Sequence, residues 1–356
     1  MPVRILIAAG GTVGHVAPAL AVADELRARG AEVSFAGTPQ RIEAELVPAR
    51  GYPFLPFAVS GFPRRPSLQL LKALGRATVA PFACSGIIKQ VRPDVVFGAG
   101  GYVAGPMLAA ARHHRLPSAL SEADARIGLA NRLAAPLVDR VFLALPVAGR
   151  EPPKYLVTGR PVDQAFVETT RAEGRAALGL GVEEQVVVAF GGSLGAGPIN
   201  DALRAAYAEG VPAGQRVILI AGRGKARADA APERFEEQEF SSAMPQLLAA
   251  ADLVVARAGG SVHEIAAAHR AAILVPWAGA ADDHQTLNAA PFAASGAALV
   301  IGDAALTASG LRAAIERVLG DSQRREQMEA AMAGLARPDA ARTMAATLLE
   351  LAEGRP

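Results

Sequence analysis

The sequence is poor in cysteine, because Cys84 is the only one in 356 residues. A single thiol cannot close an internal disulfide, and it cannot build a zinc ribbon or an iron–sulfur cluster, which need several cysteines. Aromatic residues are also scarce at 5%. Hydrophobic residues still reach 51%, so the chain can bury a large core and does not have the composition of a disordered protein. A reducing cytoplasm suits such a chain.

A large net charge is absent too. The chain has 36 Lys+Arg and 34 Asp+Glu, and 36 − 34 = +2. Taken whole, a net charge of +2 is not the strongly basic balance that is typical of nucleic-acid-binding proteins. The charge is unevenly distributed, however. Up to Arg160 the balance is 19 − 10 = +9, and beyond it 17 − 24 = −7. This split is either chance variation in solvated charge or the mark of a basic and an acidic domain with different partners.

No segment is expected to span a membrane. The longest uncharged stretch, residues 5–23, contains three glycines and a proline and has no basic region typical of a secretory signal. The segment from Gly61 to Ile88 mixes large apolar residues, Phe62 among them, with four basic ones. It is either an ordinary amphipathic helix with a solvated face or a surface that contacts anionic lipid.

The first half of the chain alternates strands, glycine turns and helices. An apolar strand at Val3–Ala9 runs into the turn Gly10–His15, and helical periodicity follows over Val16–Arg29. The strand at Asp94–Phe97 runs into a second glycine turn, Gly98–Gly101. Further strands are expected at Glu32–Ala36, Leu116–Leu120 and Arg140–Leu143.

The alternation then restarts. Gln185–Phe190 is an apolar strand that ends in a third glycine turn, Gly191–Ala196. The proline-rich stretch Pro146–Pro161 between the two series is expected to be a linker. Two such series predict two doubly wound α/β domains, with their ligands at the carboxyl ends of the strands and in a cleft between the domains. Further strands are expected at Arg216–Ala221, Leu253–Ala256 and Ala272–Pro276.

Glycine turns that open helices suit phosphates, because the backbone can approach closely and the helix N-terminus offers free N–H groups. A nicotinamide dinucleotide is disfavoured. The first turn reads Gly-Gly-x-x-Gly-His, and no acidic residue ends the second strand. His15 would face the ligand, where a neutral imidazole could take up a proton and an imidazolium could steady a diphosphate.

The second half offers a nucleotide site. Glu264 could accept both hydroxyls of a ribose, but Ser261-x-x-Glu264 is equally a capping box that needs no ligand. The run Asp282–Ala289 places polar groups where a sugar could be hydrogen-bonded. No Asp-x-Asp motif occurs, so we expect neither a metal nor a cofactor.

In combination these motifs resemble the MurG family of glycosyltransferases over nearly the whole chain. Residues 10–21 are similar to its GGTGGHxxPALA signature and residues 191–196 to its GGSxGA loop. The remaining similar segments are its second glycine loop at Gly98–Tyr102, GLANR at Gly128–Arg132, RAG…E at Arg257–Gly259 with Glu264, and DDHQxxNA at Asp282–Ala289.

The resemblance implies the GT-B architecture, in which two Rossmann-like doubly wound domains face a cleft. Residues 1–158 would form the acceptor and membrane-facing domain and residues 159–340 the UDP-sugar domain. Residues 341–356 would form a C-terminal helix that packs back on the first domain. The activity implied is inverting transfer of N-acetylglucosamine from UDP-N-acetylglucosamine to the 4-hydroxyl of lipid I, which gives lipid II in peptidoglycan synthesis.

The resemblance also implies roles for individual residues. His15 would be the catalytic base, with Glu122 as the alternative. The acceptor diphosphate would lie on the loops containing Gly11, Gly14, Gly100, Gly101 and Tyr102. Ser193 would contact the donor diphosphate and Glu264 the ribose, Phe240, Ser241 and Met244 would flank the uracil, and Gln285 and Asn288 would bind the sugar. The other donor contacts implied are Thr12, Gly14, Asn131 and Gly195.

The chain departs from the family pattern at several positions. Val13 replaces a glycine, and the His-Glu-x-Asn motif reads Ser121-Glu122-Ala123-Asp124. The arginine that ends the family's GNPVR segment is Asp163 here, with Arg160 nearby. The loop between Arg257 and Glu264 is one residue shorter. A related GT-B enzyme with another lipid or small-molecule acceptor, or a non-catalytic nucleotide-sugar-binding subunit, therefore remains an alternative.

The partners expected are the UDP-sugar, lipid I and an anionic membrane surface, with no nucleic acid. The basic first domain would hold the protein peripherally on the cytoplasmic face of the cell membrane.

Overall fold

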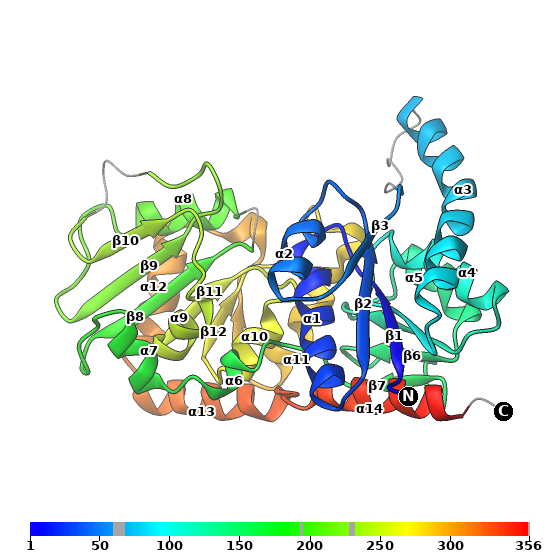
Figure 1. The fold of residues 1–356 in the computed structure, drawn as a ribbon. Helices are drawn as coiled ribbons and strands as arrows, with labels where there is room; N and C mark the ends of the chain where they lie inside the picture. Colours follow the sequence, from blue (N-terminus) through cyan, green and yellow to red (C-terminus); the bar gives the residue numbers. More distant parts are fainter. Residues whose placement is uncertain (60–67, 193–194, 228–231, 355–356) are drawn as a thin grey trace. The chain divides into compact units, whose positions relative to one another are not determined.

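The structure is a computed structural model that describes residues 1–59, 68–192, 195–227 and 232–354. The chain divides into two compact units (Figure 1). The first, the N-terminal unit, is Met1–Asp163 together with Asp339–Pro356, and the second, the C-terminal unit, is Gln164–Pro338. Both are parallel-sheet α/β domains of the Rossmann-like kind.

The N-terminal unit contains a seven-stranded sheet in the order β3-β2-β1-β4-β5-β6-β7, in which neighbouring strands run parallel. Apolar runs such as Arg4–Ala8 form its central strands, as expected where both faces of a sheet are covered. The strands are β1 Arg4–Ala8, β2 Glu32–Gly37, β3 Phe54–Pro56, β4 Val95–Gly98, β5 Ser118–Glu122, β6 Arg140–Leu143 and β7 Tyr155–Val157.

Helices cover both faces of this sheet. On one face α1 and α14 bury residues such as Val16, Leu26, Met344 and Leu348 against the strands. On the other face α3, α4 and α5 form a second core around Met107. The helices are α1 Val13–Ala28, α2 Glu43–Ala49, α3 Leu68–Val91, α4 Ala104–His113, α5 Leu129–Ala134 and α14 Ala340–Glu353, and a 3-10 turn spans Ala135–Leu137.

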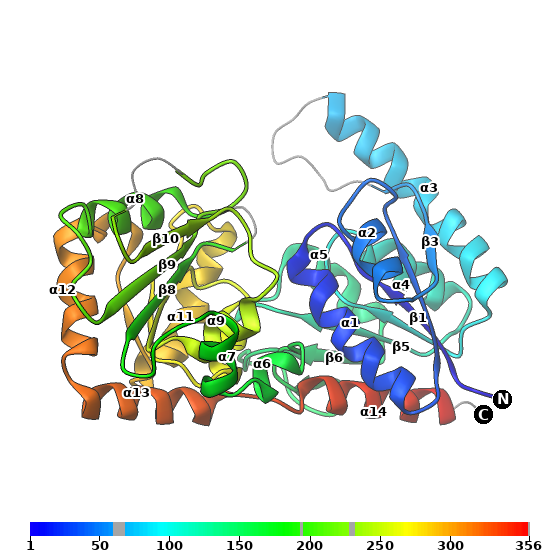
Figure 2. The ribbon, with the colours of Figure 1, turned by 60° about the vertical axis from the view of Figure 1, so that its left-hand side comes forward.

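The C-terminal unit contains a six-stranded parallel sheet in the order β10-β9-β8-β11-β12-β13. Helices α8 and α12 pack together against it through residues such as Leu203 and Ile315 (Figure 2). The strands are β8 Gln185–Phe190, β9 Gln215–Ile220, β10 Phe235–Gln238, β11 Leu253–Ala256, β12 Ala272–Leu274 and β13 Ala298–Val300. The helices are α6 Ala165–Glu168, α7 Arg171–Ala177, α8 Gly197–Ala206, α9 Met244–Ala250, α10 Val262–Ala267, α11 His284–Ala294, α12 Ala308–Leu319 and α13 Ser322–Leu335, with 3-10 turns at Ala281–Asp283 and Asp303–Ala305.

The structure confirms the predicted strands to within a residue or two and corrects two expectations. Helix α1 begins at Val13 rather than Val16, so His15 lies in its first turn. The proline-rich stretch 146–161 is not a linker, because it contains β7, which pairs with β6. Among the described residues, no helix is both long and apolar enough to cross a membrane. The start of the basic segment, residues 61–67 with Phe62, lies outside the described residues.

Candidate functional site

The first two glycine turns lie side by side at the carboxyl edge of the N-terminal sheet. Strands β1 and β4 are neighbours with Ala8 opposite Gly98, and the Ala99 N–H donates to the Ala8 carbonyl at 2.9 Å. A Cβ at Gly101 would lie 2.6 Å from the Gly10 carbonyl oxygen, and Gly101 has φ +74°. A side chain here would clash with the neighbouring turn, so the close approach requires glycine.

His15 lies where these two turns meet. A Cβ at Gly100 would be 2.8 Å from its ring carbon Cδ2. Its Nδ1 is 3.2 Å from the Thr12 hydroxyl oxygen, which makes no hydrogen bond to the start of α1. Thr12 occupies the N-cap position, but its hydroxyl orients the imidazole instead of capping the helix. The N-terminal N–H groups of α1 therefore have no side-chain cap, as an anion site requires.

The surroundings of His15 keep it neutral. Its pKa is lowered to about 4, first by burial and then by the charge of Arg160, while Asp124 and Glu43 act in the opposite direction. At pH 7 the ring therefore carries no charge. Of the two roles considered from the sequence, proton uptake fits the free protein and an imidazolium that steadies a diphosphate does not.

Glu43 supports the first turn from behind and was missed by the sequence analysis. Its side chain is fully buried, and its carboxylate accepts the Gly11 N–H at 3.0 Å and the Thr38 N–H at 3.1 Å. The Thr38 hydroxyl also donates to it. Gly11 contacts Tyr102 as well, since a Cβ there would be 3.1 Å from the tyrosine ring. The turn is therefore fixed before any ligand binds.

Glu122 ends β5 and holds the loop that follows. It is 4% exposed, and its carboxylate accepts N–H groups of Asp124 at 3.1 Å and Gly128 at 2.9 Å and the Asn131 side-chain amide at 2.9 Å. Burial is the main cause that raises its pKa. A buried carboxylate with three donors is built to position a loop, so the geometry favours His15 over Glu122 as the base. Asn131 also donates to the Ser121 carbonyl at 3.1 Å.

Two residues that depart from the family pattern also lie in this region. The Arg160 guanidinium donates to the carbonyl of Gly14 in the first turn of α1. Asp163 forms an ion pair with Arg50 at 2.9 Å, and Arg50 also pairs with Asp24. The two positions therefore make different contacts here: Arg160 contacts the glycine turn, and Asp163 pairs with Arg50 at the surface of the N-terminal unit.

The third glycine turn follows β8 in the C-terminal unit. Ser193 lies outside the described residues. Gly195 has φ +66°, and a Cβ there would be 1.8 Å from the Ala221 carbonyl oxygen, which the Asn200 amide holds at 2.8 Å. The Lys225 ammonium lies 3.4 Å from the Gly195 carbonyl. The turn thus packs directly on the end of β9, with a cation beside it.

Glu264 lies in the first turn of α10. Ser261 occupies the N-cap position, but its side chain makes no cap hydrogen bond. The complete capping box that the sequence offered for Ser261 and Glu264 is therefore not formed, and the Glu264 side chain is half-buried.

The polar run after β12 meets the loop after β11. The Asn288 amide, 1% exposed, donates to the Ala258 carbonyl at 3.2 Å. The Gln285 side-chain oxygen Oε1 accepts the Trp277 N–H at 2.9 Å, and its side-chain nitrogen Nε2 would be 3.9 Å from a Cβ at Gly259. The structure therefore brings Gln285 and Asn288 together at the loop that leads to Glu264.

The segment expected to flank a base follows β10. Phe240 is 60% exposed, and the Ser241 hydroxyl accepts the Ala243 N–H at 3.1 Å. Met244 begins α9. Arg257, by contrast, is a structural residue, because it is buried and pairs with Asp303 at 2.6 Å.

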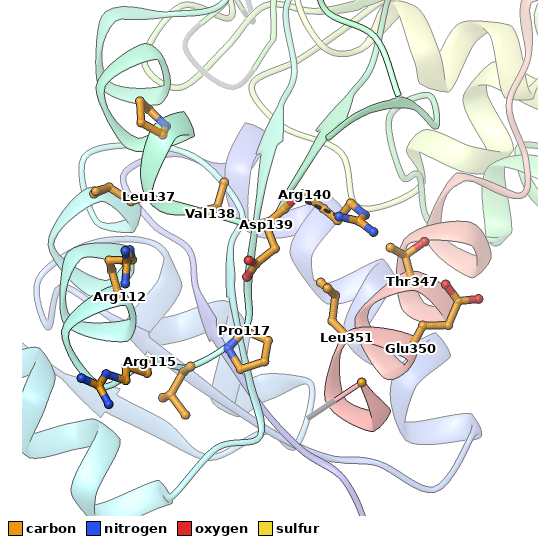
Figure 3. A pocket seen from close by; sticks show the side chains of 13 residues that line it. Arg112, Arg115, Pro117, Leu137, Val138, Asp139, Arg140, Thr347, Glu350 and Leu351 are labelled. Atoms are coloured by element: carbon orange, nitrogen blue, oxygen red, sulfur yellow. Dashed lines mark hydrogen bonds between the residues drawn. The ribbon is translucent and has the colours of Figure 1, made fainter. Parts of the chain in front are cut away.

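A cavity of about 690 Å³ lies elsewhere in the N-terminal unit, where β5 and β6 begin (Figure 3). Arg112 and Arg140 line it together with Glu350 of α14. None of the predicted site residues lines this cavity, so it is not the candidate site. Within the described ranges, no group of three or more His, Cys, Asp or Glu side chains is placed to hold a metal ion.

Comparison with known proteins matches two family models. Residues 5–143 match the glycosyltransferase family 28 N-terminal domain, and residues 186–344 match the family 28 C-terminal domain. The chain is 39% identical over 363 residues to a UDP-N-acetylglucosamine–N-acetylmuramyl-(pentapeptide) pyrophosphoryl-undecaprenol N-acetylglucosamine transferase of Stutzerimonas stutzeri, covering 99% of this chain and 100% of that one. It is 37% identical to a protein of the same name from Paenarthrobacter aurescens, covering 98% and 96%.

A solved structure of the same family also aligns with the chain. MurG of Acinetobacter baumannii aligns with a TM-score of 0.77 and 29% identity, covering 98% of this chain and all of that one. The UDP-GlcNAc 2-epimerase of Neisseria meningitidis, solved with UDP-GlcNAc bound, aligns with a TM-score of 0.68 at 14% identity, which shows a shared fold alone.

Proposed function

Because this chain belongs to the MurG family of glycosyltransferases, we infer that it transfers N-acetylglucosamine from UDP-N-acetylglucosamine to lipid I and so forms lipid II for peptidoglycan. The Stutzerimonas stutzeri relative is named for this activity, and the alignment covers its full length. Within the structure, the observation that supports it best is the pair of adjacent glycine turns with a neutral histidine between them.

We propose that the C-terminal unit binds the donor. Glu264, in the first turn of α10 after the loop that follows β11, accepts the ribose hydroxyls, and the exposed Phe240 and the half-buried Ser241 flank the uracil with Met244. Gln285 and Asn288 lie at the loop before Glu264, where they hold the sugar directly or through that loop. The Gly195 turn receives the diphosphate.

The chemistry proposed at the N-terminal unit is a single displacement. The acceptor 4-hydroxyl oxygen attacks C1 of N-acetylglucosamine from the face opposite UDP, the new C–O bond forms as the C1–O bond to UDP breaks, and the anomeric centre inverts. His15 Nε2 takes the hydroxyl proton, because Nδ1 faces Thr12 and the ring is neutral.

The charge that develops on departing UDP needs positive groups. Helix α8 begins directly after the third glycine turn, has no acidic residue in its first turn and no side-chain cap. Its N–H groups therefore face the position proposed for the donor diphosphate and stabilise the leaving group.

We propose further that the N-terminal unit binds an anionic membrane surface from the cytoplasmic side. Phe82 of α3 is 77% exposed, and Leu129 and Leu133 of α5 are 61% and 70% exposed. Helix α4 packs against both α3 and α5. These apolar side chains, on the half of the chain with a charge of +9, fit a lipid surface.

Binding to vesicles tests the membrane proposal. Wild-type protein should bind vesicles that contain phosphatidylglycerol and dissociate as salt rises, and Leu129→Gln/Leu133→Gln should bind more weakly. Val182→Gln is the control, because Val182 is an apolar residue of the C-terminal unit that is even more exposed, at 84%. Equal binding to neutral vesicles would contradict the proposal.

The activity is tested with labelled UDP-N-acetylglucosamine and purified lipid I. We expect label in lipid II, a lower kcat for His15→Gln and a raised donor KM for Glu264→Gln, with Glu326→Gln on the exposed surface of α13 as control. Transfer to another acceptor with none to lipid I would refute the assignment.

A further inference from the structure

Arg160 lies over the exposed side of the first glycine turn. Its guanidinium donates to the Gly14 carbonyl, a contact between residues 146 positions apart in the chain. A Cβ at Gly14 would be 3.5 Å from a guanidinium nitrogen. Gly14 itself is exposed and Arg160 is half-exposed, so a ligand on this turn reaches both.

The turn needs positive charge if it is to hold a diphosphate. The buried Glu43 carboxylate takes up the Gly11 N–H from behind, so that donor is directed away from a ligand, and its negative charge opposes an anion on the same turn. The N–H groups of α1 supply only a partial positive charge. A full positive charge in contact with the turn offsets the negative charge of Glu43.

The arginine that the family pattern places at 163 cannot do this here, because that residue is Asp163, paired with Arg50. Arg160 stands three positions earlier in the same segment. A guanidinium carries five N–H donors in a planar fork, so it can hold a backbone carbonyl and a phosphate oxygen at once.

We propose that Arg160 binds the acceptor diphosphate, holding a phosphate oxygen over the first glycine turn while it fixes the Gly14 carbonyl. The inference rests on the proposed function, which puts a diphosphate-linked acceptor on this turn.

Arg160 also couples the acceptor to the base. The charged groups that act on His15 are Arg160, which lowers its pKa, and Asp124 and Glu43, which raise it. A phosphate on Arg160 offsets the cation, so acceptor binding raises the pKa of His15 and makes it a stronger base when the substrate is in place.

Binding of a prenyl diphosphate tests the inference without requiring transfer. Geranylgeranyl diphosphate is titrated into wild-type protein, Arg160→Gln and Arg160→Lys in the presence of saturating UDP, which occupies the donor site. Loss of a charge-assisted hydrogen bond should weaken binding by about 10- to 100-fold in Arg160→Gln, and Arg160→Lys should recover part of it. Arg150→Gln, at an exposed arginine of the same unit, is the control.

Kinetics give the second readout. Arg160→Gln should raise the KM for lipid I by a similar factor and leave the KM for UDP-N-acetylglucosamine within about twofold. The double variant Arg160→Asn/Asp163→Arg, which restores the family pattern, should bind the acceptor better than Arg160→Gln.

Equal prenyl diphosphate binding by wild type and Arg160→Gln, no binding by wild type, or a raised KM for the donor alone would each overturn the inference. A wild-type protein that binds the probe through Arg160 but does not transfer to lipid I would instead overturn the proposed function.

Discussion

Replacing Glu43 with glutamine removes part of the hydrogen bonds that support the first glycine turn. One carboxylate oxygen accepts the Thr38 N–H and hydroxyl, and the other accepts the Gly11 N–H. A glutamine can keep its oxygen on Thr38, but its NH2 group then faces the Gly11 N–H, donor against donor. The reverse orientation sets the NH2 group against the Thr38 N–H instead, and the Thr38 hydroxyl must then turn to accept from it.

The magnitude follows from the burial of the site. Glu43 is 0% exposed, so water cannot replace the lost partner. Losing a hydrogen bond to a charged acceptor and leaving buried donors unsatisfied together cost about 2–5 kcal/mol. Glu45→Gln is the matched control, because Glu45 lies in the first turn of the same helix but is exposed, and its replacement should cost less than about 0.5 kcal/mol.

Urea unfolding of the full chain measures the stability, and transfer kinetics measure the consequence for the site. Glu43→Gln should also raise the KM for lipid I and spare that for the donor, because Gly11 belongs to the proposed acceptor loop. A stability loss below about 1 kcal/mol would refute the reasoning about the buried bonds. A large loss with an unchanged acceptor KM would show that this turn does not hold the acceptor.

Three further predictions concern pH, backbone geometry and the thiol. The pKa of His15 is about 4, and the base must be neutral, so the enzyme should lose activity only as pH falls through that value. The kcat/KM of wild type should therefore stay level from pH 7 to 5.5, and Arg160→Gln should move the acidic limb of the profile to higher pH. A wild-type limb near pH 6.5 would contradict this. Gly195→Ala should raise the donor KM in transfer kinetics and lower the stability in urea unfolding by about 3 kcal/mol or more. Gly197→Ala is the control, because a Cβ there meets nothing within 4 Å, and it should change neither quantity. Cys84 is fully buried with its pKa raised to about 12, so iodoacetamide should modify it only after unfolding; rapid labelling of native protein would oppose this.

The sequence predicts the central strands of both sheets well. Gln185–Phe190 and Leu253–Ala256 form strands with the predicted bounds, because continuous apolar runs between glycine signals leave few alternatives. The short outer strands were missed. β7 is only three residues long, Tyr-Leu-Val, within a proline-rich stretch, and β10 reads Phe-Glu-Glu-Gln. Neither is an apolar run of the length that predicts a strand, and each pairs with one neighbour.

The candidate site was predictable where local geometry determines it. Glycine turns after strands place their backbone at the carboxyl edge of a sheet wherever the sheet forms, which is how His15 was identified. Glu43 and Arg160 were not predictable in this way. Their contacts with the first turn span 32 and 146 positions in the chain, and only the folded topology brings them together.

Helix α14 has a consequence for how the protein is made. Its residues Met344, Ala345 and Leu348 complete the apolar core of the N-terminal unit, yet they are synthesised after the whole of the C-terminal unit. During translation the continuous segment Gln164–Pro338 can close its own core as it emerges, while the unit that emerges first waits with the face of α1 uncovered. Of the two units, the N-terminal one is therefore the last to finish folding, and a ribosome that stalls within α14 leaves it exposed to proteolysis.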